Sequence, residues 1–319
     1  MFGKLKEAGS IAWDSVRTFP QDNPFEMAAA LAYFTLLSIA PLLLVIIGAA
    51  GMLMGEAQVR EALVSQARQL VGSDGASLLQ TVMQRASESP KNALSMIIGS
   101  VLTIFGATTI FAHLQKSLNR VWDVQAKPSN AVLGFARARL ISLSVVLGLA
   151  FLMLASLVLQ AAISGLQEYL ATLFPGAAML STIINNLVSL TLVALVLAML
   201  FRYVPDVEIS WHDTIVGAVL TALLLTIGNY AIGLYLGHAA VGSAYGAAGS
   251  AVVFMVWVYY TAVVLFFGAN TTKVIARHHG SPILPSEYAE FLPGAEPPQN
   301  EPRPGPEEED SGHRRAAAG

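Results

Sequence analysis

The run LVSLTLVALVLAMLF, residues 187–201, contains no charged side chain and decides the class of fold. Extended back to Ser181, this uncharged stretch reaches the roughly 20 helical residues that are needed to cross a hydrocarbon core of ~30 Å. A soluble helix of this length would carry polar residues on its outer face. The stretch therefore predicts a transmembrane helix.

Five other blocks reach a similar length. They are Met27–Ala50, Ala93–His113, Leu140–Ala162, Thr214–Leu236 and Ala247–Thr272. Over the whole chain 55% of residues are hydrophobic and 12% are charged, whereas a soluble domain has about 25% charged residues. We expect an all-α, polytopic membrane protein with about six transmembrane helices.

The first block contains Pro41. Proline in a spanning helix frees a backbone carbonyl, which a neighbouring hydroxyl such as that of Ser38 can satisfy. The pattern predicts a kinked helix rather than a broken one.

Basic residues are divided unequally between the two sides of this six-helix scheme. The N-terminus, the second and fourth loops and the C-terminus together hold fourteen Lys and Arg, and the other side holds four, all in the first loop. Because cytoplasmic loops are enriched in Lys and Arg, both termini are expected in the cytoplasm.

The first loop, residues 51–92, has the apolar spacing of a helix, as at Val59, Leu63 and Ala67. The sequence GSDG at residues 72–75 interrupts it, and glycine-rich sequence of this kind is typical of a turn. We expect an external helical hairpin between helices 1 and 2, which either caps the bundle or rests in the headgroup layer.

Three domains follow from this pattern. Residues 1–26 form a cytoplasmic amphipathic segment, and residues 27–273 form the six-helix membrane domain. Residues 274–319 form a cytoplasmic, mostly disordered tail, because their acidic, proline-rich composition cannot bury enough apolar surface to fold.

The sequence offers little catalytic chemistry. The absence of cysteine excludes disulfides and thiolate sites. His278 and His279 are adjacent and diverge on a helix, and His212-Asp213 is interpreted as a helix start rather than a catalytic dyad. We expect no enzyme activity, catalytic residue, metal or cofactor, and no binding of nucleic acid.

Polar side chains within spanning helices are the candidate functional residues. Arg202 is either an interfacial arginine, paired with Asp206 or a lipid phosphate, or a fixed cation for an anionic substrate. Asn229 and Asn270 serve either as packing contacts between helices or as hydrogen-bonding groups for a substrate. Tyr245 lies in a glycine-rich stretch that predicts a tight turn or a re-entrant segment.

Several motifs together resemble the BrkB/YihY family of bacterial inner-membrane proteins. They are ALAYFTLLSIAPL (30–42), LNRVWD (118–123), FRYVPDV (201–207), Asn229-Tyr230, SAYG (243–246) and WVYY (257–260). The resemblance runs from Pro20 to Lys273 and covers all six blocks in order. It marks six motif or gating residues, namely Tyr33, Pro41, Asn119, Trp122, Pro205 and Gly246.

The resemblance implies a multi-pass protein of the bacterial inner membrane. The family was once labelled ribonuclease BN, and the lack of nuclease ligands here agrees with the rejection of that label. Its members have been linked to serum resistance and to the handling of lipid or lipopolysaccharide precursors.

We therefore expect a transporter or accessory factor that handles envelope lipids or lipopolysaccharide precursors. Its partners would be membrane lipids, with an anionic lipid or precursor bound between helices four, five and six by Arg202, Asn229, Tyr245 and Asn270. A non-transporting envelope scaffold is the alternative. The sequence is also compatible with an oligomer.

Overall fold

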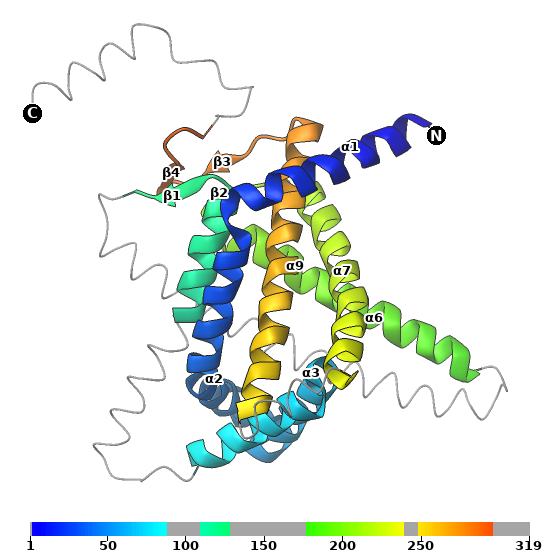
Figure 1. Ribbon diagram of the computed structural model, residues 1–319, viewed down its shortest axis with the longest axis vertical. Coiled ribbons are helices and arrows are strands. Elements are labelled where there is room, and N and C mark those ends of the chain that lie inside the picture. The colour runs from blue at the N-terminus through cyan, green and yellow to red at the C-terminus, as the bar shows by residue number, and fades with distance from the viewer. Residues whose placement is uncertain (1, 88–108, 128–176, 239–247, 296–319) are drawn as a thin grey trace, which may run out of the picture.

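The computed structural model describes residues 2–87, 109–127, 177–238 and 248–295, and it consists mainly of long helices (Figure 1). Four of them form the body of the bundle: α2 (Pro24–Met54), α6 (Ala177–Tyr203), α7 (Trp211–His238) and α9 (Gly249–His279). Helix α9 contacts both α2 and α7, and α7 also packs on α6. A further helical segment covers residues 109–121.

Three of these helices are long and apolar enough to cross a bilayer, over Ile183–Tyr203, Trp211–Ile232 and Gly249–His279. Helix α2 is a fourth candidate span if its two bent halves cross together. The expected class, an all-α polytopic membrane protein, is confirmed. The block Leu140–Ala162, and Ala93–His113 except for its last five residues, lie outside the described residues.

Helix α2 bends by 53° between Pro24–Ala40 and Leu42–Met52. The bend falls at Pro41. The backbone nitrogen of proline carries no hydrogen, so it cannot donate the hydrogen bond that a regular helix requires. The kink that the sequence predicts is therefore present, and the helix continues beyond it.

Different elements cover the two ends of the bundle (Figure 1). Helix α1 (Phe2–Thr18) and the 3-10 turn η1 (Phe19–Asp22) cross one end, where the short strands also lie. Helix α3 (Glu56–Ser87) lies across the opposite end. The N-terminal helix and the last described strands thus share one end of the molecule.

Helix α3 is the hairpin that the sequence predicts. Its backbone leaves the helical region at Gly72, with φ 81° and ψ −171°, a conformation that glycine adopts without steric cost. Leu63 before the break and Met83 after it are both buried in one apolar cluster with α2 and α9. Arg60 joins the two arms, because its Nη1 donates to the carbonyl of Met83 over 3.4 Å.

Helices α7 and α9 approach each other closely where glycine removes a side chain. A Cβ on Gly217 would overlap the side chain of Thr272, and one on Gly268 would overlap Thr221. Small residues permit this kind of contact between helices in membranes. A Cβ on Gly228 would likewise overlap the hydroxyl of Tyr260.

Two short antiparallel pairs connect chain segments at the α1 end. Strand β1 (Val124–Ala126) pairs with β4 (Ala289–Phe291), and β2 (Val207–Glu208) pairs with β3 (Leu284–Pro285). Beneath them lies a buried apolar cluster. Its members are Trp122, Val124, Val207, Ile209, Ala276 and Ile283. The strands therefore fasten residues 280–291 onto the ends of the helices.

The last helix continues beyond residue 274, where the sequence predicts that the tail begins. Helix α9 continues to His279, since Val274, Ile275 and Ala276 are all buried. Gly280 ends it with a positive φ of 69°, as glycine commonly does at the end of a helix. Residues 296–319 lie outside the described part of the chain.

Candidate functional site

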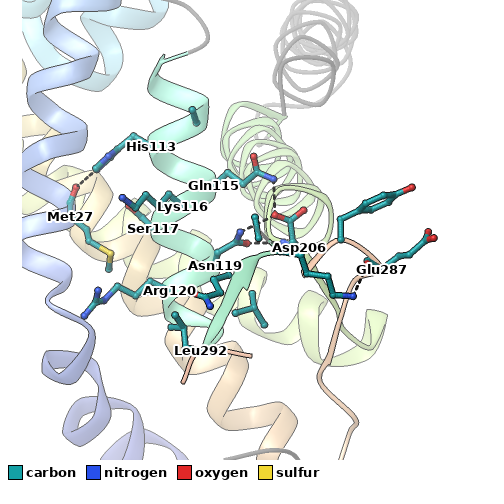
Figure 2. Close-up of a pocket in the computed structure, with 16 residues that line it drawn as sticks. Met27, His113, Gln115, Lys116, Ser117, Asn119, Arg120, Asp206, Glu287 and Leu292 are labelled. Carbon is teal, nitrogen blue, oxygen red and sulfur yellow. Dashed lines mark hydrogen bonds between the residues drawn. The ribbon is translucent and has the colours of Figure 1, made fainter. Parts of the chain in front are cut away.

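A pocket of about 700 Å³ lies at the α1 end of the molecule. We call it the Asp206 pocket. The helical segment 109–121, strand β1, Asp206 and residues 287–292 form most of its wall (Figure 2). Its volume falls in the range of ~300–1,000 Å³ that is typical of small-molecule sites.

The carboxylate of Asp206 is held by two amide side chains from one face of the 109–121 helix (Figure 2). Gln115 donates to Asp206 Oδ2 over 3.1 Å, and Asn119 donates to the same atom over 2.9 Å. The Asp206 backbone N–H donates in return to Asn119 Oδ1 over 2.7 Å. Asn119, which is 7% exposed, thus fixes both the main chain and the side chain of Asp206.

Local sequence explains this geometry. Gln115 and Asn119 are four residues apart and therefore lie on one face of the helix. Pro205 directly precedes Asp206, and proline disfavours helical backbone in the residue before it. Helix α6 accordingly ends at Tyr203, which leaves Asp206 in a bend that faces the neighbouring helix.

Three cationic residues also line the Asp206 pocket: Lys116, Arg120 and Lys127. All three are exposed, and Lys127 Nζ donates to the carbonyl of Glu287 over 2.9 Å. The side chain of Glu287 points away from Asp206 in Figure 2. The pocket thus combines an oriented carboxylate with cations at its exposed wall.

Apolar and aromatic groups border the same pocket on the side of α2. Met27 contributes to the wall, and its carbonyl lies 3.3 Å from His113 Nε2. The His113 ring packs against Phe34, with centroids 5.1 Å apart. The pocket therefore joins a polar wall to the apolar flank of a candidate span.

A charged cluster lies behind this wall, where the 109–121 helix ends. Asp123 adopts a left-handed backbone, φ 58°, which Asp tolerates better than most residues. Its Oδ2 lies 2.7 Å from Lys273 Nζ and 3.0 Å from Arg277 Nη2. Lys273 also donates to the carbonyl of Val121 over 2.7 Å. The cluster ties the LNRVWD motif to the last turns of α9.

The charges of this cluster also affect the pKa of Asp22, at the end of η1. Burial raises the pKa of its carboxyl above the ordinary value, and Lys273 partly offsets this effect while Asp123 adds to it. Partial burial of the Asp22 carboxyl therefore disfavours its ionisation despite the nearby ammonium group.

The structure does not bring Arg202, Asn229 and Asn270 into one cavity. Arg202 lies over the Trp211 ring, 5.7 Å from its centroid, a cation–π contact at the start of α7. Asn229 is eighteen residues further along α7, which is ~27 Å at 1.5 Å per residue. Its Oδ1 is buried and has no hydrogen-bond partner among the described residues.

Asn270 serves as a tether for the N-terminal helix. Its side chain is 1% exposed, and its Nδ2 donates to the Ser15 carbonyl over 2.9 Å and to Thr18 Oγ1 over 3.2 Å. These contacts favour the packing interpretation of Asn270 over substrate binding.

The six motif or gating residues have different environments. Asn119 lies in the Asp206 pocket, and Pro41 marks the bend of α2. Trp122 is 1% exposed within the cluster under the strands, and Pro205 is also buried. Tyr33 is 52% exposed on α2. Gly246, together with the candidate binding residue Tyr245, lies outside the described residues.

Sequence reasoning missed the role of Asp206, which was weighed only as a partner for Arg202. Asn119 and Asp206 are 87 positions apart, and neither lies in the middle of an apolar block. A signal was nevertheless present, because LNRVWD begins five positions after the predicted block that ends at His113, and FRYVPDV begins at the last residue of the block that ends at Phe201. Both motifs therefore had to reach the same membrane surface.

The apolar spans and the kinked α2 define a polytopic α-helical membrane protein. The chain belongs to the BrkB family, since the family model described as Virulence factor BrkB matches residues 15–289. This result confirms the resemblance drawn from the motifs.

Relatives from several bacteria are similar over most of the chain. The UPF0761 membrane protein RC1_0578 of Rhodospirillum centenum is 26% identical over 279 residues, which cover 86% of this chain and 59% of the relative. The UPF0761 membrane protein NMB0524 of Neisseria meningitidis serogroup B is 24% identical over 275 residues, covering 85% and 64% respectively. The chain thus spans about three fifths of the length of these relatives. No solved structure matches it.

Proposed function

We propose that this protein handles phosphate-bearing envelope lipids at the bacterial inner membrane, as a transporter or as an accessory factor. The headgroup would bind in the Asp206 pocket. The observation that carries the proposal is the combination of exposed cations with an oriented carboxylate, directly beside the apolar flank of α2.

The cations suit the phosphate. Lys116 and Arg120 are exposed on the last turns of the 109–121 helix, where a headgroup at the membrane surface can reach them. Arginine binds phosphate oxygens through two parallel N–H groups, and lysine binds them as a point charge. Hydrogen bonds to charged groups of this kind contribute roughly 1.5–3 kcal/mol each.

The carboxylate suits a second group of the ligand. The amides of Gln115 and Asn119 orient Asp206, so its carboxylate is held in a fixed position in the pocket wall. A hydroxyl or amine beside the phosphate would donate a hydrogen bond to this carboxylate. Phosphoglycerol and the phosphorylated amino sugars of lipopolysaccharide precursors both carry such groups, and the acyl chains would lie along α2.

Lipid retention tests the pocket. Protein purified in mild detergent would be incubated with phosphatidylglycerol or with a lipid A precursor, and the retained lipid measured by mass spectrometry. The double variant Lys116→Ala/Arg120→Ala should retain at least about tenfold less lipid, since ~1.4 kcal/mol corresponds to a factor of ten. The double variant Arg60→Ala/Arg68→Ala is the matched control, because it removes two cations from α3 at the opposite end.

Movement of labelled lipid between leaflets of proteoliposomes then separates the two roles. Movement that the pocket variant abolishes supports a transporter, and retention without movement supports an accessory factor. Equal retention by wild type and pocket variant would overturn the proposal and favour the alternative, a non-transporting scaffold.

A further inference from the structure

We infer that His212, Asp213 and His279 form a binding site for a divalent transition-metal ion at the junction of α7 and α9. None of the three residues lines the Asp206 pocket, so this inference stands independently of the proposed function. The sequence predicts no metal site, because His279 lies 66 positions from Asp213.

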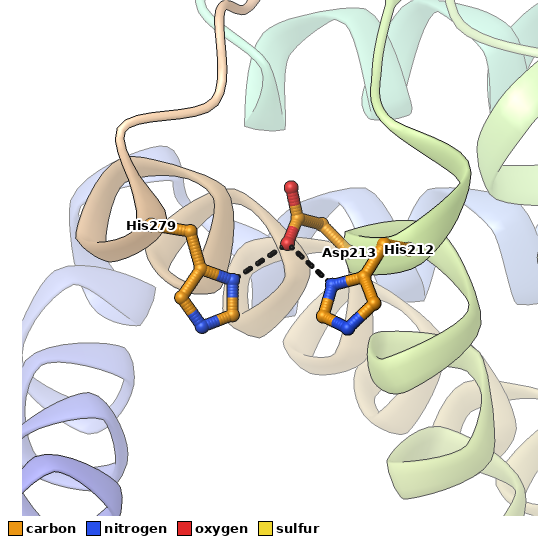
Figure 3. A group of neighbouring side chains, drawn as sticks. All are labelled: His212, Asp213 and His279. Atoms are coloured by element: carbon orange, nitrogen blue, oxygen red, sulfur yellow. Dashed lines mark hydrogen bonds and ion pairs between the residues drawn. The ribbon is translucent and has the colours of Figure 1, made fainter.

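The three side chains converge on one point (Figure 3). Asp213 Oδ1 lies 2.7 Å from His279 Nδ1 and 3.4 Å from His212 Nδ1. Each of the three residues offers one ligand atom, and these ligand atoms lie within 4.8 Å of one another. The two imidazole rings face the carboxylate from opposite sides, with centroids 5.7 Å apart (Figure 3).

The packing of α7 on α9 fixes two of the three ligands. Asp213 belongs to the first turn of α7 and its side chain is 1% exposed. His279 is the last residue of α9, directly before the glycine that ends this helix. Because α7 and α9 pack closely through Gly217 and Thr272, the positions of these two ligands are set by the helix contact.

The donor set selects the class of metal. Two imidazole nitrogens and one carboxylate oxygen are ligands for Zn²⁺ and neighbouring divalent transition metals, whereas Mg²⁺ and Ca²⁺ prefer oxygen ligands. Bonds of ~2.1 Å in a tetrahedral site place ligand atoms about 3.4 Å apart. The distance from Asp213 Oδ1 to His212 Nδ1, 3.4 Å, already matches this value. The distance to His279 Nδ1, 2.7 Å, is shorter.

Exposure leaves room for a further ligand. The side chain of His212 is 75% exposed and that of His279 is 35% exposed, so an ion held by the three residues keeps one side open to water. A bound ion would also compensate the charge of the buried Asp213 carboxylate. Without an ion, the same three side chains form only a hydrogen-bonded link between the helices.

Metal binding by the full-length protein distinguishes these alternatives. Detergent-purified protein would be stripped with EDTA and dialysed against Zn²⁺, and the bound metal counted by mass spectrometry. We expect one Zn²⁺ per chain, and a Co²⁺ form with the visible absorption of nitrogen and oxygen ligation. Zn²⁺ should also raise the apparent Tm, because it binds the folded state.

Two single variants test the ligands. His279→Gln and His212→Gln should each weaken Zn²⁺ binding by at least about 100-fold, since even residues that only orient a ligand change metal affinity by 10–100-fold. The exposed position of His212 makes its variant safe for folding. His278→Gln is the matched control, because this neighbouring histidine contacts Asp14 on α1 instead.

The control variant and the wild type also show which results would contradict the metal site. His278→Gln should bind Zn²⁺ like the wild type. Failure of the stripped wild type to take up Zn²⁺ would overturn the inference and leave the hydrogen-bonded link. Equal loss of binding in all three variants would overturn it too, because the effect would then not depend on the position of the histidine.

Discussion

The ammonium group of Lys273 lies 2.7 Å from Oδ2 of Asp123, and this ion pair joins α9 to the end of the 109–121 helix. The lysine side chain is 8% exposed and the aspartate side chain 25%. Lys273 also donates to the Val121 carbonyl, one of the carbonyls that a helix leaves without a partner at its C-terminal end. One buried cation thus satisfies two acceptors where the 109–121 helix ends.

Removing the charge of Asp123 should destabilise the protein strongly. Asn tolerates the same left-handed backbone, so Asp123→Asn keeps the turn but leaves Lys273 buried without its counter-ion. We expect a loss of roughly 3 kcal/mol in the free energy of unfolding, measured in mild detergent. Arg277→Gln is the control, with a loss below about 1 kcal/mol because Arg277 is half exposed. Equal losses would contradict this ranking.

The contact of Asn119 with Asp206 should stabilise the pocket more than the contact of Gln115 with Asp206 does. Asn119→Ala removes two hydrogen bonds to Asp206, whereas Gln115→Ala removes one. At about 1 kcal/mol each, the expected losses in the free energy of unfolding are about 2 and about 1 kcal/mol. Asn119→Asp should lower the free energy of unfolding still further, because it places a second carboxylate against Asp206. A tolerated Asn119→Asp would show that the contact is weaker than its geometry indicates.

Because α7 packs closely on α9, the stability of the protein should be sensitive to a single methyl group added at this contact. The Thr221 and Thr272 hydroxyls are bonded to the carbonyls of Gly217 and Gly268, so these side chains cannot turn away without losing a hydrogen bond. Gly268→Ala should cost about 1–3 kcal/mol of unfolding free energy through overpacking. Gly48→Ala in α2 is the control, because among described residues nothing lies within 4 Å of its added Cβ. Comparable apparent Tm values for the two variants would refute the tight contact.

Asp22 should make stability depend on pH in the direction opposite to most carboxylates. Its pKa is raised in the folded protein, chiefly by burial. The resulting stabilisation is therefore fully present below the unfolded pKa of 3.8 and is lost as pH rises through the folded pKa. At about pH 7 Asp22→Asn should match or exceed the wild type in apparent Tm. The advantage should shrink on acidification, and a variant that is less stable at neutral pH would contradict the assignment.

The two ends of the bundle should be accessible from opposite sides of the membrane. The chain contains no cysteine, so Trp13→Cys on α1 and Gln80→Cys on α3 each introduce a single reactive thiol. In spheroplasts, an impermeant maleimide should label the Gln80→Cys variant directly and the Trp13→Cys variant only after permeabilisation. Labelling of both from outside would be incompatible with both the structure and the positive-inside prediction.

Features that depend on local composition could be predicted from the sequence. The uncharged run before Phe201 becomes the span of α6, because burial in hydrocarbon requires only length and apolar side chains. The hairpin of α3 follows from the spacing of Leu63 with its neighbours and from Gly72, and the bend in α2 follows from Pro41. Each of these signals lies within a few residues of the structure it determines.

Features that depend on distant residues could not be predicted in the same way. Asp206 meets Asn119 across 87 positions, and His279 meets Asp213 across 66. Strands β2 and β3 contain two residues each, which is too short to show the alternation by which strands are recognised. The candidate site was therefore assigned to residues at membrane depth, whereas the structure forms its pocket at the surface end.

The order in which the chain is synthesised gives the strand pairs a particular consequence. Strands β1 and β2 are made before α9, but their partners β4 and β3 come from residues 284–291, after α9. The pocket wall that includes Glu287 and Leu292 can therefore be completed only when α9 has left the ribosome. Until that moment a nascent chain presents two unpaired backbone edges at this surface, so assembly of the pocket reports that α9 has been made.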